Sequence, residues 1–305
     1  MSHHNQFTPI PRSTTSDAHP PQSVLRPLGL AASFAVFLYV GWMLLAGFFQ
    51  PRADWFAGGG WHSPLLFYYA CLDAFALALS AAFLCGLDGR SFRMLGLSFF
   101  SGWFRQAALG LSWGVCVISA AVLLLFIARA ADVALFASPS LSRLLFLAFF
   151  LLLSSVFEEL TFRGYALVRA ADAVGAVIAC LASSALFGFA HFANPQATLL
   201  SSLNTALAGV LLSIARLRSR ALWMPIALHF AWNFSLGPVF SFPVSGYTFG
   251  ALRLSAPAPG PLWLSGGAYG PEASVALTLA LVGAIPLLLR FPRRFQPLPS
   301  APNQS

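Results

Sequence analysis

Long apolar runs separated by short polar breaks dominate the chain. A helix that crosses the hydrocarbon core of a bilayer needs about 20 mostly apolar residues, and eight runs reach or approach that length. The breaks contain glycine, proline or charged residues, which end helices. The predicted spans are Leu28–Phe49, Leu65–Cys85, Ala107–Ala128, Leu141–Ala170, Val174–Phe192, Leu199–Ala215, Ala221–Val239 and Ala273–Leu289. We therefore predict an all-α fold, a polytopic transmembrane bundle of about eight helices.

Composition agrees with a membrane protein. Of the 305 residues, 58% are hydrophobic and only 9% are charged, whereas soluble domains contain about 25% charged residues. We predict one membrane-embedded domain over residues 27–290, with its motif core at residues 154–272. Residues 1–26 are rich in proline and polar residues and are predicted to be a disordered tail, and residues 291–305 a short C-terminal tail. The segment Ser91–Arg105 mixes aromatic residues with arginines and is predicted to lie as an amphipathic helix at the interface.

The arginines define an orientation. The net charge is +8, but the basic residues lie at the ends of apolar runs, so we expect lipid contacts and no nucleic-acid partner. Thirteen of the 17 arginines fall on the side that holds both tails, which predicts that both termini are cytoplasmic. The four cysteines lie in apolar runs without CxxC spacing and are predicted to be free; they are Cys71, Cys85, Cys116 and Cys180.

Three charged residues lie in the interior of the fourth predicted span, away from its two ends. Such a residue at bilayer depth costs about 2.5–3.5 kcal/mol on insertion scales and needs a reason. Glu159 and Arg163 are spaced i and i+4, share a helix face and are predicted to pair. Glu158 lies about 100° around the helix, so it is predicted to point toward neighbouring helices.

Two further spans contain polar residues at helical spacing. His191 lies near the end of the fifth span, one turn after Phe187, and His229 and Asn233 share a face of the seventh. If the fourth and fifth spans form a hairpin near Asp172, Glu158 and His191 differ in depth by about 7 Å at 1.5 Å per residue. We therefore predict that Glu158, His191, His229 and Asn233 converge on one pocket.

This set of side chains suits hydrolysis. A carboxylate beside an imidazole can take a proton from water and pass it to a leaving amine, and the N–H groups of His229 and Asn233 can stabilise an oxyanion. Glu158, His191 and His229 could instead form a zinc site with an open position for water, although the HExxH signature is absent. Asn204 in the sixth span either lines the pocket or bonds helices together.

The motifs EExxxR, FxxxH and HxxxN, in this order on separate spans, resemble those of the CPBP family, the CAAX prenyl proteases and bacteriocin-processing proteins also called ABI. The resemblance extends from Ser154 to Glu272 and includes the GPE tripeptide that ends there. It implies a glutamic-type intramembrane endopeptidase without a metal cofactor, in a bacterial inner membrane.

The resemblance also implies residue roles. The first glutamate and the FxxxH histidine activate water, which assigns Glu158 and His191, and the HxxxN pair binds the oxyanion, which assigns His229 and Asn233. The supporting residues are Glu159, Arg163, Phe187 and Asn204. The implied partners are membrane lipid and a membrane-associated protein or peptide whose anchored or hydrophobic terminus is cleaved.

Two other interpretations stay open. The charged residues could form a structural ion pair in a non-catalytic scaffold, or couple substrate and protons in a transporter, although we find no inverted repeat of the kind many transporters have. Asp73 lies in the middle of the second span without an identified partner. Asp172 and Glu272 lie at span ends, where charged residues need no special explanation.

Overall fold

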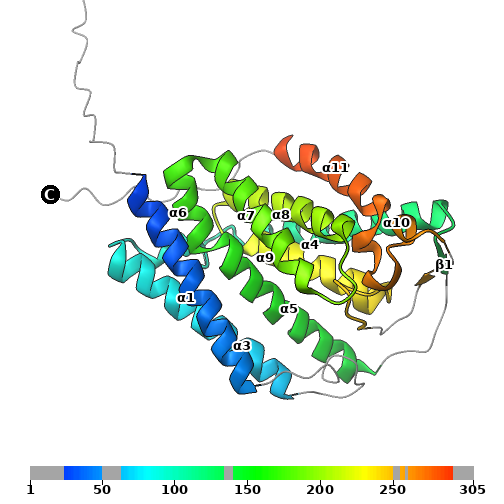
Figure 1. The fold of residues 1–305 in the computed structure, drawn as a ribbon, viewed down its shortest axis with the longest axis horizontal. Helices are drawn as coiled ribbons and strands as arrows, with labels where there is room; N and C mark the ends of the chain where they lie inside the picture. The colour runs from blue at the N-terminus through cyan, green and yellow to red at the C-terminus, as the bar shows by residue number, and fades with distance from the viewer. Residues whose placement is uncertain (1–23, 50–62, 134–139, 250–254, 258–259, 291–305) are drawn as a thin grey trace, which may run out of the picture.

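The computed structural model of the chain describes residues 24–49, 63–133, 140–249, 255–257 and 260–290. It is a bundle of helices with one pair of very short strands (Figure 1). Most of the predicted N-terminal tail and all of the C-terminal tail lie outside the described residues. The first helix begins at Leu25, two residues before the predicted domain boundary.

Each of the eight predicted spans contains a helix. The main helices are α1 (Leu25–Phe49), α3 (Ser63–Ala81), α4 (Trp103–Ile127), α5 (Leu141–Arg163), α6 (Tyr165–Val174), α7 (Ala176–Ala190), α8 (Leu199–Ser219), α9 (Trp223–Phe234) and α11 (Val275–Arg290). Short elements are α10 (Leu262–Ser265), π-helical turns at Ala82–Leu87 and Ser235–Val239, and 3-10 turns at Phe92–Leu95, His191–Ala193, Gly267–Tyr269 and Pro271–Ala273. Strands β1 (Ala131–Val133) and β2 (Ser255–Pro257) pair antiparallel, with Ala131 opposite Pro257.

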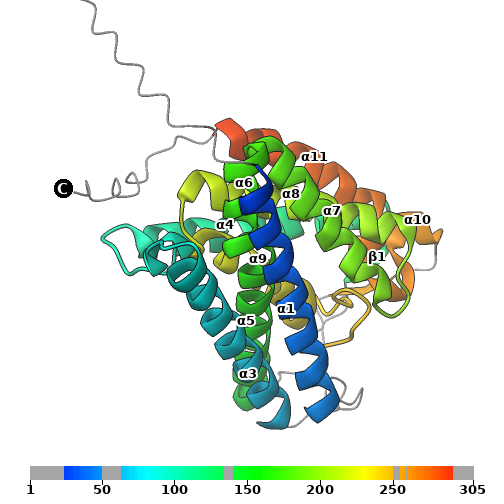
Figure 2. The ribbon, with the colours of Figure 1, turned by 60° about the vertical axis from the view of Figure 1, so that its left-hand side comes forward.

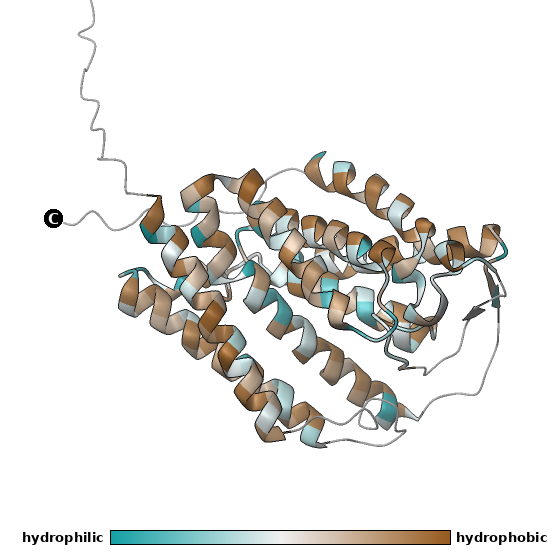
Figure 3. Ribbon diagram, viewed as in Figure 1, coloured by the Kyte–Doolittle hydropathy of each residue, from teal (hydrophilic) through white to brown (hydrophobic). Residues whose placement is uncertain are grey.

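Six of the helical segments are long and apolar enough to cross a membrane, which makes this an integral membrane protein. They include α8, which has 21 residues and is longer than the short sixth span that we predicted. Helices α9 and α11 are shorter, at 12 and 16 residues. Many large hydrophobic side chains are exposed on the bundle. Most of the length of α5 is hydrophobic, with hydrophilic residues at a few separate positions (Figure 3).

Helix α9 lies at the centre of the bundle, packed against α4, α5 and α8 (Figures 1 and 2). Two glycines of α4 allow the close approach. A Cβ atom on Gly110 would lie 2.2 Å from the carbonyl oxygen of Met224, and one on Gly114 would lie 2.4 Å from that of Leu228. Small residues at such positions let helix backbones pack closely in membranes. The packing buries α9, including His229 and Asn233.

Helix α6 is fastened to the bundle by a cluster of charged residues. Arg169 contacts Asp88 at 2.7 Å and Asp172 at 2.8 Å, and Arg90 also contacts Asp172 at 2.7 Å. The Tyr165 hydroxyl donates to Asp88 at 3.0 Å. Asp172, which we expected to need no special explanation, therefore joins α6 to the segment after α3.

The fourth predicted span is not one continuous helix. It breaks at Gly164, where a Cβ atom would lie 2.3 Å from the carbonyl oxygen of Leu160. The guanidinium of Arg216 donates to the carbonyl of Arg163 at 3.1 Å and so satisfies a group at the end of α5. The turn of the hairpin falls at Gly175, which has φ +85° and lies three residues after Asp172, near the position that we predicted.

The prediction of an amphipathic helix over Ser91–Arg105 is wrong. Only Phe92–Leu95 forms a short 3-10 turn before α4 begins at Trp103. Gly96 has φ +85°, and its carbonyl accepts a hydrogen bond from the Leu222 amide at 2.9 Å. Because Gly96 has this non-helical conformation and bonds to a segment more than 120 residues away, the chain around it does not form a helix.

The remaining predictions concern single side chains. The four cysteines are free, as predicted, and Cys180 is the buried one. Asp73 is 7% exposed, and neither of its carboxylate oxygens has a hydrogen-bond partner among the described residues. Its role stays unassigned.

Candidate active site

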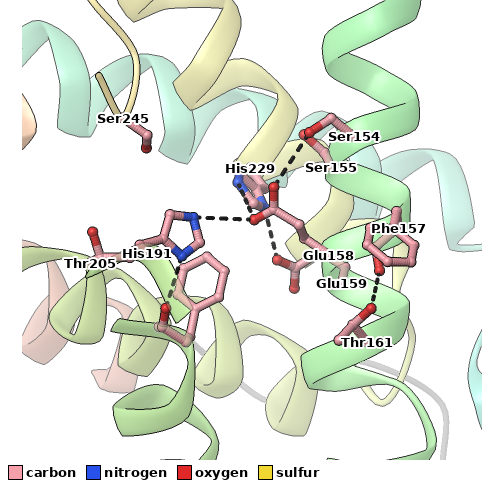
Figure 4. A network of polar contacts seen from close by, with 12 residues as sticks. Ser154, Ser155, Phe157, Glu158, Glu159, Thr161, His191, Thr205, His229 and Ser245 are labelled. Carbon is pink, nitrogen blue, oxygen red and sulfur yellow. Dashed lines mark hydrogen bonds and ion pairs between the residues drawn. The ribbon is translucent and has the colours of Figure 1, made fainter. Parts of the chain in front are cut away.

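Glu158 lies on α5 between two imidazole rings (Figure 4). Its Oε2 is 3.6 Å from His191 Nε2 and 3.7 Å from His229 Nε2. Its Oε1 accepts a long hydrogen bond of 3.4 Å from Ser154 on the same helix. The two imidazole distances are too long for good hydrogen bonds, but a single water molecule can bridge polar groups at such separations. The structure thus brings together three of the residues that we predicted to converge.

The ring of His191 is oriented by its own helix. His191 lies in the 3-10 turn directly after α7, and its Nδ1 is 2.8 Å from the carbonyl oxygen of Phe187. A carbonyl only accepts hydrogen bonds, so Nδ1 carries a proton. The Nε2 atom that faces Glu158 is then the one that can accept a proton.

His229 contacts the second glutamate as well as the first. Its Nδ1 is 2.9 Å from Glu159 Oε1, and the same oxygen pairs with Arg163 at 3.0 Å. The predicted Glu159–Arg163 pair therefore forms, and both side chains are fully buried. Both nitrogens of His229 thus face carboxylate oxygens, Nδ1 within hydrogen-bond distance of Glu159 and Nε2 at 3.7 Å from Glu158.

Phe187 packs at the centre of this group. The Arg163 guanidinium lies over its ring, with 4.2 Å between Cζ and the ring centroid. The rings of His191 and His229 meet it edge to face, at centroid distances of 4.5 Å and 6.0 Å. Such cation–π and aromatic contacts explain why the position before His191 on the same helix face is aromatic.

Glu158 and both histidines border a cavity of about 1230 Å³ within the bundle. Most of its wall is apolar and comes from α1, α5, α6, α7, α8 and α9. Asn233 also lines it, and its amide has no hydrogen-bond partner among the described residues. Asn233 therefore presents a free donor beside His229.

Asn204 borders the same cavity but is held by backbone groups. Its amide nitrogen donates to the carbonyls of Glu272 and Ser274 at 2.9 Å each, and its oxygen accepts from Thr278 at 2.7 Å. Of the two roles that we expected, lining the pocket or bonding helices together, Asn204 thus combines both: it ties α8 to the turn before α11.

Glu272 is the polar residue that sequence reasoning missed. Its side chain lines the cavity, and the residue is only 7% exposed. One oxygen accepts from the Trp232 indole at 2.9 Å, and the other accepts from the amide and the hydroxyl of Ser245. Its place at the start of the last span made it look like an ordinary terminal charge. The GPE tripeptide was the one sequence signal that could have identified it.

The donors do not form a recognisable metal centre. Among the residues described, no group of three or more His, Cys, Asp or Glu side chains is arranged to hold a metal ion. Glu158, His191 and His229 are the residues that would hold zinc under the alternative raised from the sequence. That alternative stays a hypothesis.

The site therefore combines a partly buried glutamate and two histidines beside an apolar cavity, inside a helical membrane bundle. Residues 139–235, which make up 97 of the 305 residues, match the family model described as "Type II CAAX prenyl endopeptidase Rce1-like". The match contains all three motifs, so over these residues the chain is similar to type II CAAX prenyl endopeptidases. The activity that this description names, an endopeptidase acting on a membrane-associated protein, agrees with the membrane-embedded bundle described above. No curated protein and no solved structure matches the chain.

Proposed function

We propose that the protein hydrolyses a peptide bond near a membrane-anchored or hydrophobic terminus of its substrate, using water activated by Glu158 and His191. The observation that carries the proposal is the position of Glu158 Oε2, 3.6 Å from His191 Nε2 and on the wall of the cavity. A water molecule between these two acceptors would face both a carboxylate and an imidazole.

The proposed reaction has two steps. The water oxygen attacks the carbonyl carbon of the scissile bond while its proton moves to Glu158, which gives a tetrahedral oxyanion. The C–N bond then breaks as Glu158 passes that proton to the leaving amine. His191, whose Nδ1 proton is held by a backbone carbonyl, keeps Nε2 turned toward the water.

The oxyanion would be stabilised by donors on α9. The Nε2–H of a protonated His229 and the free amide of Asn233 both border the cavity. Glu159 and Arg163 keep His229 in place, because Glu159 accepts from its Nδ1 and is itself paired with the guanidinium. Donors fixed before the reaction are worth more than donors that must reorient.

The shape of the cavity supports a membrane-associated substrate. Its apolar wall includes Ala32 and Ala35 of α1 and Ala182 and Leu186 of α7, so it offers small and aliphatic side chains to an apolar chain beside the carboxylate. A substrate anchored in lipid could place its scissile bond here while its apolar portion stays out of water. The family match favours this reaction over the transporter and the scaffold.

The test compares Glu158→Gln with Ser155→Ala on the same helix. Ser155 is buried, and its hydroxyl donates to the carbonyl of Leu151, away from the cavity lining. Protein termini in membrane fractions are compared between cells that express the wild type and each variant. We expect termini that appear with the wild type and Ser155→Ala to vanish with Glu158→Gln, since general-base catalysis contributes about 10²–10⁴-fold.

The same preparations are assayed with and without a chelator on a farnesylated CAAX reporter peptide. Retained activity agrees with direct activation of water, and activity that requires an added metal would favour the zinc alternative. Undiminished cleavage by Glu158→Gln would overturn the proposed mechanism.

A further inference from the structure

Glu272 is a buried carboxylate whose hydrogen bonds the proposed reaction does not yet use. It accepts from three donors, namely the Trp232 indole, the Ser245 amide and the Ser245 hydroxyl. No arginine or histidine within the described ranges forms an ion pair with it. Its charge is therefore balanced by oriented hydrogen-bond donors, an arrangement that stabilises a carboxylate.

The donors come from two separate walls of the cavity. Trp232 lies on α9 directly before Asn233, which we propose as an oxyanion donor. Ser245 lies in the loop that follows α9 and its π-helical turn, and Figure 4 shows it at the edge of the space into which His191 points. One side chain thus joins the helix that carries Asn233 to a loop that borders the catalytic group.

The loop is held in a conformation that it would not adopt by itself. Ser245 has φ +50°, in the left-handed region that is unfavourable for a residue with a side chain. Gly246 has φ +86°, and a Cβ atom there would lie 2.1 Å from the carbonyl oxygen of Pro195, a few residues after His191. The Gly246 amide donates to the carbonyl of Tyr269 at 3.0 Å. The two hydrogen bonds that Ser245 donates to Glu272 stabilise the loop and so offset this strain.

The turn that presents Glu272 is itself anchored. Asn204 of α8 donates to the carbonyls of Glu272 and Ser274, and the Ser274 hydroxyl donates to the carbonyl of Pro271 at 2.6 Å. A continuous path of hydrogen bonds therefore runs from α8 through the turn to α9 and to the loop.

We propose that Glu272 is a positioning residue for the peptidase reaction, which holds Asn233 and the Ser245 loop in place around the substrate. This inference rests on the proposed function. A glutamine at residue 272 cannot replace the carboxylate, because it has one accepting oxygen and its own NH₂ group would face donors. The loss should appear mainly in kcat, since Asn233 is proposed to act on charge that develops in the transition state.

The experiment uses the full chain in lipid nanodiscs, with Glu272→Gln, Trp232→Phe and the control Asp132→Asn, which changes an exposed acid on β1. Hydrogen exchange of the peptide that contains Ser245 is measured together with kcat and KM on the farnesylated CAAX reporter. For Glu272→Gln we expect the hydrogen-exchange rate of the Ser245 amide to rise about tenfold and kcat to fall about tenfold, because the loss of one net hydrogen bond has an effect of this size. We expect KM to change far less.

Trp232→Phe removes only the bond to α9, so it should lower kcat without raising exchange at Ser245. It also serves as the second variant if Glu272→Gln does not fold. The proposal is overturned if exchange at Ser245 is unchanged in Glu272→Gln, or if both variants keep the wild-type kcat. A wild type that cleaves no reporter contradicts the proposed function instead, and the exchange measurement then decides by itself whether Glu272 holds the loop.

Discussion

At the scale of single residues, His229 depends on a buried ion pair for its position. Glu159 accepts from both His229 and Arg163, and neither Glu159 nor Arg163 has any exposed surface. Arg163 also donates to the carbonyl of Gly209 at 3.3 Å and stacks on Phe187. One guanidinium therefore links α5, α7 and α8 around the candidate catalytic group.

Replacing Arg163 alone should be more harmful than replacing the pair. In Arg163→Met, Glu159 stays buried and loses its guanidinium partner, and breaking a buried pair in this way costs about 3–5 kcal/mol. The double variant Glu159→Gln/Arg163→Met removes both charges and should recover part of that loss. Thermal unfolding in detergent compares the midpoints, and a double variant less stable than Arg163→Met would contradict this account.

At the scale of elements, the position of α9 is determined by the glycines of α4. Helix α9 has only 12 residues and contributes His229, Asn233 and Trp232, so a small displacement of this helix moves the donors on one wall of the cavity. Gly114 is in contact with backbone atoms of α9 that cannot rotate away.

Gly114→Leu should therefore displace α9. Overpacking in a well-packed core costs about 1–3 kcal/mol, and we expect both the unfolding midpoint and the reporter cleavage rate to fall. Gly283→Ala in α11 is the matched control, because a Cβ atom there meets no atom within 4 Å. If Gly114→Leu retains wild-type activity and stability, the close packing of α4 and α9 is not what positions the donors.

Two elements differ from their prediction for the same physical reason. The break at Gly164 and the irregular segment around Gly96 both lie where the backbone bonds to a distant part of the chain. Apolar periodicity reports how a segment partitions into lipid, but it carries no information about such partners.

At the scale of the whole molecule, the arginines predict how the bundle lies in its membrane. Thirteen of 17 fall on the side of the two tails, and such a bias sets the orientation of helical membrane proteins. In a bacterial host, a reporter that is active only in the cytoplasm should work when fused after Ser305. A reporter that is active only outside the cytoplasm should work when it is fused after Gly59, which lies between the first two predicted spans. The reverse result at both positions would invert the predicted topology.

The sequence by itself determined the membrane-protein class, the approximate extent of most helical segments and the pairing of Glu159 with Arg163. These features are local, because a span is a contiguous run and Glu159–Arg163 is a pair one helical turn apart. The spacing of the polar residues predicted that Glu158, His191, His229 and Asn233 converge, and the resemblance to family motifs added a role for each.

Only the tertiary structure decided which of these groups touch. The contact between His229 and Glu159 joins residues 70 positions apart, and the bonds of Glu272 reach 27 and 40 positions along the chain. Spacing along a helix cannot predict such contacts, because they depend on how α9, the Ser245 loop and the turn before α11 pack together. In the sequence Glu272 therefore resembles an ordinary charge at the end of a span, whereas in the fold it contacts Trp232 and Ser245 on two walls of the cavity.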